Sequence, residues 1–419
     1  MNPTSFVTII AAIAGLLEAF LLPVFGAIID YTKHRQTCGR IVAFLIWAIQ
    51  TIQISISGDT WFAMAVLQAL VVALFEAHYL LAVSYLPDVS RYEVSHETYT
   101  RFNRYIFSFQ YTGQTCFLIL ALVISYFLDF DSVQSARLGQ SVSSIILIFC
   151  YTRAWTRLPP MPERRKLPAD SNNLVFEGFR QNYKTFVSIL NNPNKTLKWF
   201  FITIIVSEAG STSLMPIAVS YLSRVLQYGT LDVALTFLLA VIFAIPGAVI
   251  NSYLSNKYNV RTSLRIIFVF LFTVTLSAPF VLQPGRGEKL GYVWGLLWGF
   301  SIGWFYSGAQ LFFTLCVPPK QEAELAGFFV YCTIVLQWVP SILYFVIVEN
   351  GFKVQWGMAS LCVFQLLSMF TINMVPQWDE VLQGSKTFLV AEARSDKKVD
   401  ALPTDTKLVE ETQESNLSA

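Results

Sequence analysis

Three glutamates lie within long apolar stretches of the sequence: Glu18, Glu76 and Glu208. A charged side chain at membrane depth costs at least about 2.5 kcal/mol, so each is expected to face a bundle interior or a wet cavity. There it could carry a proton or balance the ammonium group of a substrate, or it could make only a structural contact between helices. His78 is two residues from Glu76 and so lies on another helix face, which makes a direct pair between them unexpected.

The segment around Glu208 has the most polar character of the three. Pro216 follows within two turns, and a proline inside a membrane helix frees backbone groups toward a cavity. We predict that this segment binds a small polar solute and that Glu208 carries the coupling proton or recognises the substrate. The hydroxyl groups available near it belong to Ser207, Ser211 and Thr212.

The composition indicates the environment of these residues. The 419 residues are 54% hydrophobic and only 13% charged, with a mean hydropathy of +0.53, whereas soluble domains are roughly 25% charged. This is an integral membrane protein, and soluble enzyme classes are excluded. Its apolar runs predict eleven membrane helices: residues 4–29, 41–56, 61–86, 105–128, 138–155, 199–222, 231–254, 264–282, 290–317, 325–348 and 354–375.

Enzyme and cofactor motifs are missing from the sequence. The glycine-rich stretch Pro284-Gly-Arg-Gly287 lacks the Lys-Ser/Thr of a nucleotide-binding loop, and neither His-Glu-x-x-His nor Gly-x-Ser-x-Gly occurs. We therefore expect no enzymatic activity, no cofactor, no metal site and no nucleic-acid partner. The expected partners are the lipid bilayer, a small-molecule substrate and protons.

The loops indicate orientation and domain organisation. One alternating set of loops carries 19 Lys and Arg against five in the other, which places the first set in the cytoplasm. Residues 1–155 form a predicted bundle of five spans, residues 156–198 a cytoplasmic linker, and residues 199–375 a bundle of six spans. Residues 376–419 are predicted to be a disordered acidic cytoplasmic tail.

The linker contains a predicted amphipathic helix. Its apolar residues recur at steps of three and four beside Arg180 and Lys184, as in a helix that lies on the inner leaflet or on the protein. We assign it no regulatory role from the sequence. The apolar stripe is Phe176, Phe179, Tyr183, Phe186 and Leu190.

The two halves share a repeated pattern. A small residue is followed by Asp or Asn four positions later and by Arg five positions after that, in both cases at the cytoplasmic end of a span. Duplicated halves around a basic linker are typical of secondary transporters with a central site between the halves. The two frames are Gly26, Asp30, Arg35 and Ser252, Asn256, Arg261.

The first frame resembles the loop after the second helix in the major facilitator superfamily. The chain looks most like its autophagy-related vacuolar effluxer family in four motifs: Pro23-Val-Phe-Gly-Ala-Ile-Ile-Asp30, Ser84-Tyr-Leu-Pro-Asp88, Glu208-Ala-Gly210 and Val317-Pro-Pro-Lys-Gln-Glu-Ala-Glu-Leu-Ala-Gly-Phe-Phe329. The resemblance implies a two-bundle transporter that exports amino acids from a vacuole or lysosome-like compartment.

The resemblance also implies a cytoplasmic gate. Asp30 and Arg35 would belong to a charge network that latches the two halves, although Asp30 beside Lys33, His34 and Arg35 could also be simply solvated. Glu322 and Glu324, before the next-to-last span, would meet Arg35 or Arg40 on closure, although helix capping alone could account for them.

The family has six helices in each half, whereas the first half here has five predicted spans, with the loop motif after the first. We expect an initial helix to be missing from the sequence. The alternative function is a membrane receptor or scaffold that kept the transporter bundle without transporting.

Glycines and prolines in the apolar runs predict close packing and kinks. A glycine stripe on one helix face permits close approach of a neighbouring helix, for tight packing or for a sliding gate surface. Prolines inside spans can kink them. The stripe is Gly291, Gly295, Gly299 and Gly303, and the prolines are Pro23, Pro216, Pro246, Pro279 and Pro340.

Overall fold

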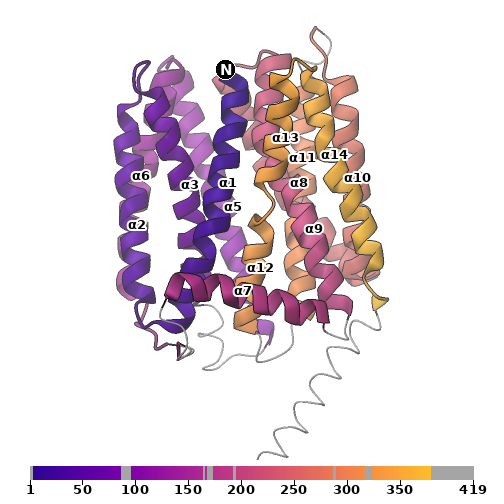
Figure 1. Cartoon of the computed structure of the whole chain (residues 1–419). Helices are drawn as coiled ribbons and strands as arrows, with labels where there is room; N and C mark the ends of the chain where they lie inside the picture. Colours follow the sequence, from indigo (N-terminus) through magenta and orange to yellow (C-terminus); the bar gives the residue numbers. More distant parts are fainter. Residues whose placement is uncertain are drawn as a thin grey trace, which may run out of the picture.

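The computed structural model describes residues 3–85, 96–163, 166–167, 173–191, 195–285, 289–316 and 322–378. In these residues the regular structure is helical, with no strand. Long helices run side by side between the two ends of the molecule, and one helix crosses the lower end (Figure 1). The helices form two groups, which follow the two halves of the sequence.

The first half contributes five long helices among the described residues: α1 (Pro3–Tyr31), α2 (Arg35–Ile52), α3 (Trp61–Val83), α5 (His96–Phe127) and α6 (Ser132–Arg157). Several begin before the predicted apolar run. In α6, for example, Asp131 and Gln134 form a reciprocal capping box ahead of the apolar residues. Apolar runs therefore locate the membrane-buried part of each helix, while polar turns extend it at the ends.

The second half contributes α8 (Lys195–Val225), α9 (Thr230–Lys257), α10 (Val260–Val281), α11 (Leu290–Cys316), α12 (Glu322–Ile334), α13 (Trp338–Glu349) and α14 (Val354–Met374). Nine helical segments of the described chain are long and apolar enough to cross a membrane, with α12 and α13 counted together. The helices α6 and α11 fall outside these nine but run alongside them in the bundle (Figure 1).

The predicted span over residues 325–348 is present, but it is not one continuous helix, because a turn at residues 335–337 separates α12 from α13. Pro340 has no N–H to donate, so a helix that continued through it would leave the carbonyl of Leu336 without its partner. The chain instead starts a new helix, with Pro340 in its first turn, where the missing donor costs nothing. The other interior prolines, such as Pro216 in α8, stay within their helices.

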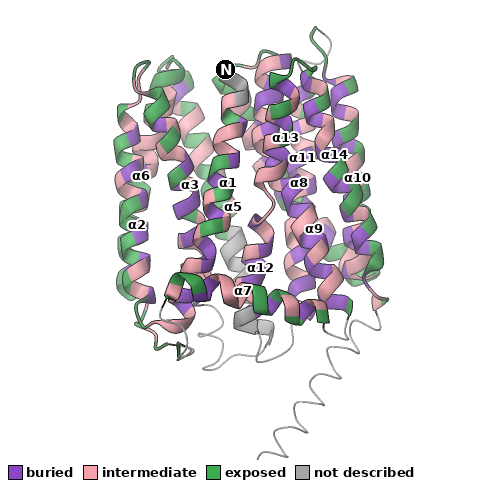
Figure 2. Cartoon of the chain, in the orientation of Figure 1, coloured by how far each residue is buried: buried purple, intermediate pink, exposed green. Residues whose placement is uncertain are grey.

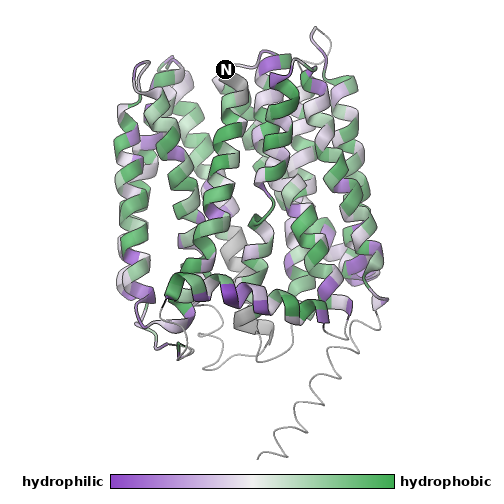
Figure 3. Ribbon diagram, in the orientation of Figure 1, coloured by the Kyte–Doolittle hydropathy of each residue, from purple (hydrophilic) through white to green (hydrophobic). Residues whose placement is uncertain are grey.

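The linker helix α7 (Leu174–Asn191) is the helix that crosses the lower end (Figure 1). The exposed basic residues Arg40 after α1 and Arg157 at the end of α6 lie at the ends of helices on the same side, so this end corresponds to the predicted cytoplasmic face. Apolar residues dominate the long helices, while polar residues gather near their ends and along part of α7 (Figure 3).

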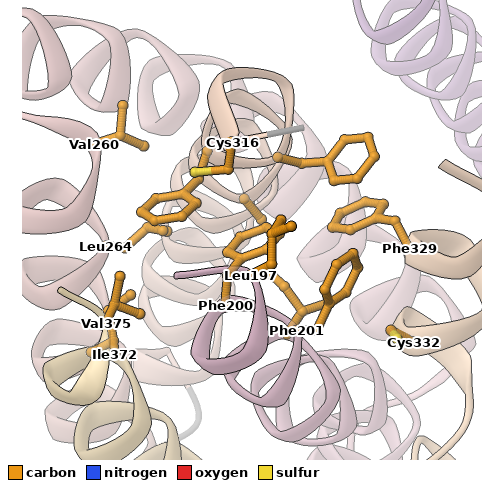
Figure 4. Packing of buried hydrophobic residues seen from close by; sticks show 14 of the residues in the cluster. Leu197, Phe200, Phe201, Val260, Leu264, Cys316, Phe329, Cys332, Ile372 and Val375 are labelled. Carbon is orange, nitrogen blue, oxygen red and sulfur yellow. The ribbon is translucent and has the colours of Figure 1, made fainter. Parts of the chain in front are cut away.

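The two halves differ in how tightly they are packed. In α8 most side chains are buried, whereas in α6 only Ser144 and Trp155 are, and Figure 2 shows most buried residues in the second group of helices. Aromatic rings fill one core of the second half, where Phe200 stacks on Phe312 with centroids 4.6 Å apart (Figure 4). The second half therefore provides the more rigid body.

The predicted glycine stripe lies at the contact between α11 and α9. A Cβ atom at Gly299 would collide with the backbone of Ala240, and one at Gly303 with the backbone of Ala244. Gly247 approaches the backbone of α11 in the same way, at Phe300. The two helices are thus in backbone contact, as small residues allow inside a membrane.

Candidate functional site

The three membrane glutamates belong to three helices from both halves: Glu18 to α1, Glu76 to α3 and Glu208 to α8. Glu18 is 0% exposed and Glu208 is 2% exposed, and Glu76 is half-buried. The Glu76 carboxylate lies near enough to each of the others to interact with it electrostatically. We call these three side chains the carboxylate cluster.

Glu208 lies among hydroxyl groups. The Thr212 hydroxyl, one turn along α8, donates a hydrogen bond to Glu208 Oε2 over 3.3 Å. Tyr306 on α11 has its hydroxyl 3.5 Å from Thr212 Oγ1 and within reach of the Glu208 carboxylate, and Tyr111 on α5 interacts with it electrostatically. Glu208 is therefore surrounded by residues of both halves.

Glu18 is buried without a polar partner. Neither of its carboxylate oxygens has a hydrogen-bond partner in the described part of the chain. One turn earlier on α1, Gly15 lies against the start of α13, where a Cβ atom would be 3.0 Å from Gln337 Cγ. Glu18 thus lies one turn from the interruption between α12 and α13, whose Gln337 carbonyl accepts a 2.6 Å hydrogen bond from Ser213 of α8.

Among the residues that the structure describes, no Lys or Arg forms an ion pair with a glutamate of the cluster. The ion pair in this part of the chain joins Arg180 and Glu177 of α7 instead. His78 does not supply a charge either, because the Trp155 indole N–H donates to His78 Nε2 over 2.8 Å. An accepting Nε2 has no proton, so this ring is the neutral tautomer. Uncompensated charges are costly in a low-dielectric interior, so the cluster requires protons or a bound cation.

The predicted substrate hydroxyls have separate roles. Thr212 contacts Glu208 as described above, whereas Ser211 Oγ is buried without a hydrogen-bond partner in the described chain. Ser207 donates to the Ile204 carbonyl of its own helix. Ser211 is thus the predicted hydroxyl still available to a ligand. Within the described ranges no group of three or more His, Cys, Asp or Glu is arranged to hold a metal ion.

The predicted gate residues of the first half make contacts, among the described residues, that the sequence did not indicate. Asp30 Oδ2 accepts a 3.0 Å hydrogen bond from Gln181 Nε2 of the linker helix α7. Arg35 is buried, donates to the Ser84 carbonyl over 3.0 Å and lies 4.7 Å above the ring of Tyr85. These contacts tie the loop after α1 to the end of α3 and to the linker, and thereby fix this end of the first half.

The first turns of α2, directly after this loop, cap the C-terminal end of α6. Arg40 and Gln36 of α2 both donate to the Trp155 carbonyl, and Gln36 also donates to the Leu158 carbonyl. Cationic and amide donors at a helix C-terminus satisfy its orphan carbonyls. The basic loop therefore positions the point where the chain leaves the first half. Gly26 has open space where a Cβ atom would be added.

The residues of the second frame lie near the ends of α9, α10 and α14. Arg261 Nη2 donates to the Asn373 carbonyl at the end of α14 over 3.0 Å, and Asn256 is exposed. The buried polar residue nearby is Asn251, which accepts a 2.8 Å hydrogen bond from Ser263. Glu322 and Glu324 fall at the start of α12, but their side chains lie outside the described residues.

A cavity lies between the halves, at the end of the molecule that α7 crosses. It is lined by residues of α1, α3, α7 and α12, including Gly26, Asp30, Ser84, Gln181 and Tyr331. The predicted gate frame therefore borders a space that both halves and the linker enclose.

Sequence reasoning missed several residues of this region. Tyr111 and Tyr306 were not singled out because tyrosines are ordinary members of apolar runs, and only their convergence on Glu208 distinguishes them. Gln181 was not singled out either, because a polar residue is ordinary in an amphipathic helix. No local signal in the sequence marks these contacts.

The comparisons with known proteins now identify the family. The family model described as "Vacuole effluxer Atg22 like" matches residues 1–380. The chain belongs to this family. The suggested relationship to the vacuolar effluxers is thereby confirmed, and with it a transporter family. No curated protein sequence matched the chain.

Solved structures of major facilitator superfamily transporters share the fold, so the predicted fold class is also confirmed. A variant of the nucleoside transporter NupG has a TM-score of 0.60 at 12% identity, covering 89% of this chain and 91% of that one. A bacterial homologue of the iron transporter ferroportin, in its inward-facing state, has a TM-score of 0.58 at 12% identity. The match covers 89% of this chain and 90% of that one. The transporter FucP, in its outward conformation, has a TM-score of 0.52 at 14% identity. The match covers 90% of this chain and 91% of that one.

Proposed function

We propose that this vacuole effluxer family member is a secondary active transporter that exports amino acids or similar small polar solutes from a vacuole or lysosome-like compartment. The observation that supports this is the carboxylate cluster, which brings Glu18 and Glu76 of one half together with Glu208 of the other. A site shared between two halves is what alternating access requires, because rocking the halves opens it to either side in turn.

Repulsion between the carboxylates of the cluster couples the rocking of the two halves to proton binding. Three carboxylates, two of them buried and one half-buried, are stable together only when protons or a substrate ammonium neutralise them. Rocking changes the distance between Glu208 and the two glutamates of the first half, and so changes how tightly the cluster holds its cations. The acidic lumen of such a compartment loads protons, and the neutral cytoplasm accepts them.

The same chemistry favours substrates with an ammonium group. Ser211 Oγ and the unpartnered Glu18 oxygens are available to a bound solute. A substrate carboxylate finds no ion-pairing Lys or Arg at the cluster within the described chain. We therefore expect lysine and neutral amino acids to be transported in preference to glutamate.

Transport by reconstituted protein tests the proposal. Proteoliposomes with an acidic interior are loaded with labelled amino acid, and efflux is measured with and without the pH gradient. Glu208→Gln keeps an oxygen that can accept from Thr212 but cannot titrate, so it should abolish the effect of the gradient while exchange of substrate continues. Glu208→Asp, which still titrates, is the matched control and should retain a response.

Near-normal gradient-driven efflux by Glu208→Gln would show that Glu208 has only a structural role between helices. Absence of efflux by the unmodified protein for every amino acid tested would contradict the proposed substrate class and favour a receptor or scaffold.

A further inference from the structure

The linker helix α7 turns its less apolar side toward the protein. Gly178 packs so closely on α1 that a Cβ atom there would collide with the Pro23 carbonyl. Gln181, on the same side, donates to Asp30, and Glu177, Thr185 and Ile189 complete the buried face. Apart from Ile189, the contact is made by a glycine and polar residues, so it uses little of the apolar surface that α7 carries.

The aromatic side of α7 points away from this contact. Phe176 is 65% exposed and Tyr183 is 68% exposed. Phe179 packs against Phe20 of α1, with ring centroids 5.4 Å apart, and Phe20 is itself 59% exposed on a membrane span. The aromatic stripe of α7 is therefore continuous with a side of α1 that lies at membrane depth.

Basic residues accompany this stripe. Lys184 is exposed on α7, whereas Arg180, one turn before it, forms an ion pair with Glu177 of the same helix. The same end of the molecule, which α7 crosses in Figure 1, also carries exposed positive charges after α1 and along the chain from α6 to α8. They belong to Lys33, Arg40, Arg153, Arg157, Lys166 and Lys195.

An exposed aromatic stripe flanked by Lys and Arg matches one partner. Helices that lie in the plane of a bilayer bury aromatic and aliphatic residues at the headgroup boundary, while basic residues beside them contact anionic headgroups. We propose that α7 docks on anionic phospholipids of the cytoplasmic leaflet, with Phe176 and Tyr183 inserted beneath the headgroups and Lys184 at their phosphates. The opposite side of α7 then holds the loop at Asp30, so the bilayer surface anchors the linker against the first half.

Photo-cross-linking of the full-length protein tests this surface. Benzoylphenylalanine replaces Tyr183 on the stripe or, as the matched control, Ser188, which is also exposed on α7 but lies off the stripe. The protein is reconstituted in vesicles of phosphatidylcholine and phosphatidylserine in equal parts, irradiated, and analysed by mass spectrometry for lipid adducts. Position 183 should give several-fold more adduct than position 188, with phosphatidylserine preferred.

The charge at Lys184 tests the preference for anionic lipid. In the cross-linking variant, Lys184→Gln should lower the ratio of phosphatidylserine to phosphatidylcholine adducts by about fivefold, whereas Lys184→Arg should preserve it. Equal adduct yields at the two positions, or a ratio that does not change in Lys184→Gln, would overturn the proposal. Because the readout is a lipid adduct, it is independent of whether the protein transports amino acids.

Discussion

Gly299 offers a test of how closely α9 and α11 must approach each other. A Cβ atom on Gly299 would collide with the carbonyl oxygen, Cα and carbonyl carbon of Ala240. These are backbone atoms, so no side-chain rotation relieves the collision, and Gly299→Ala must push the two helices apart. Gly26 of α1 is also a helical glycine, but a Cβ atom there would meet nothing within 4 Å. Gly26→Ala is therefore the matched control.

Both variants gain helix propensity, but only Gly299→Ala also overpacks a helix contact. Replacing glycine by alanine inside a helix favours the helix by roughly 0.5–1 kcal/mol in both. Only Gly299→Ala adds the cost of overpacking, about 1–3 kcal/mol. The helix term cancels in the comparison, so Gly299→Ala should be less stable than Gly26→Ala by about 1–3 kcal/mol. That difference is a factor of about 5 to 150 in the unfolding equilibrium.

Unfolding of the purified protein in mixed micelles, followed by tryptophan fluorescence as dodecyl sulfate is added, measures this difference. The unmodified protein provides the reference for both variants. Equal free energies of unfolding for the two variants, or a greater loss in Gly26→Ala, would refute the assignment of Gly299 to a backbone contact.

Two further predictions concern hydrogen bonds of the first half. Asp30→Ala and Gln181→Ala should be non-additive in a double-mutant cycle of unfolding free energies, with a coupling of about 0.5–1.5 kcal/mol, and additive losses would show that the bond contributes nothing. Trp155→Phe removes the donor to His78 Nε2 and should destabilise the protein by about 1–3 kcal/mol in thermal or dodecyl sulfate unfolding. Trp61→Phe, at an exposed tryptophan, should change stability much less, and similar losses in both variants would contradict the assigned bond.

The sequence by itself determined the class of fold and the place of most helices. A membrane span must be both apolar and helical, because the bilayer offers no partner for free backbone groups, so hydropathy alone locates it. The family motifs could also be recognised in the sequence, because each lies within a short stretch such as Pro23 to Asp30. The break within the predicted span over residues 325–348 was missed, because hydropathy does not show whether a helix continues through Pro340 or restarts before it.

Only the tertiary structure decided which residues meet. Glu18, Glu76 and Glu208 were each visible in the sequence as acids in apolar runs, but their convergence, and that of Tyr111 and Tyr306 on Glu208, depends on how whole helices are placed. For α7 the periodicity predicted the aromatic stripe but not the side that packs on the protein. That side follows from close backbone approach at Gly178 and the bond from Gln181 to Asp30, which no local pattern encodes. The periodicity of apolar residues is a property of one helix, whereas a contact between two helices depends on how the surfaces of both fit together.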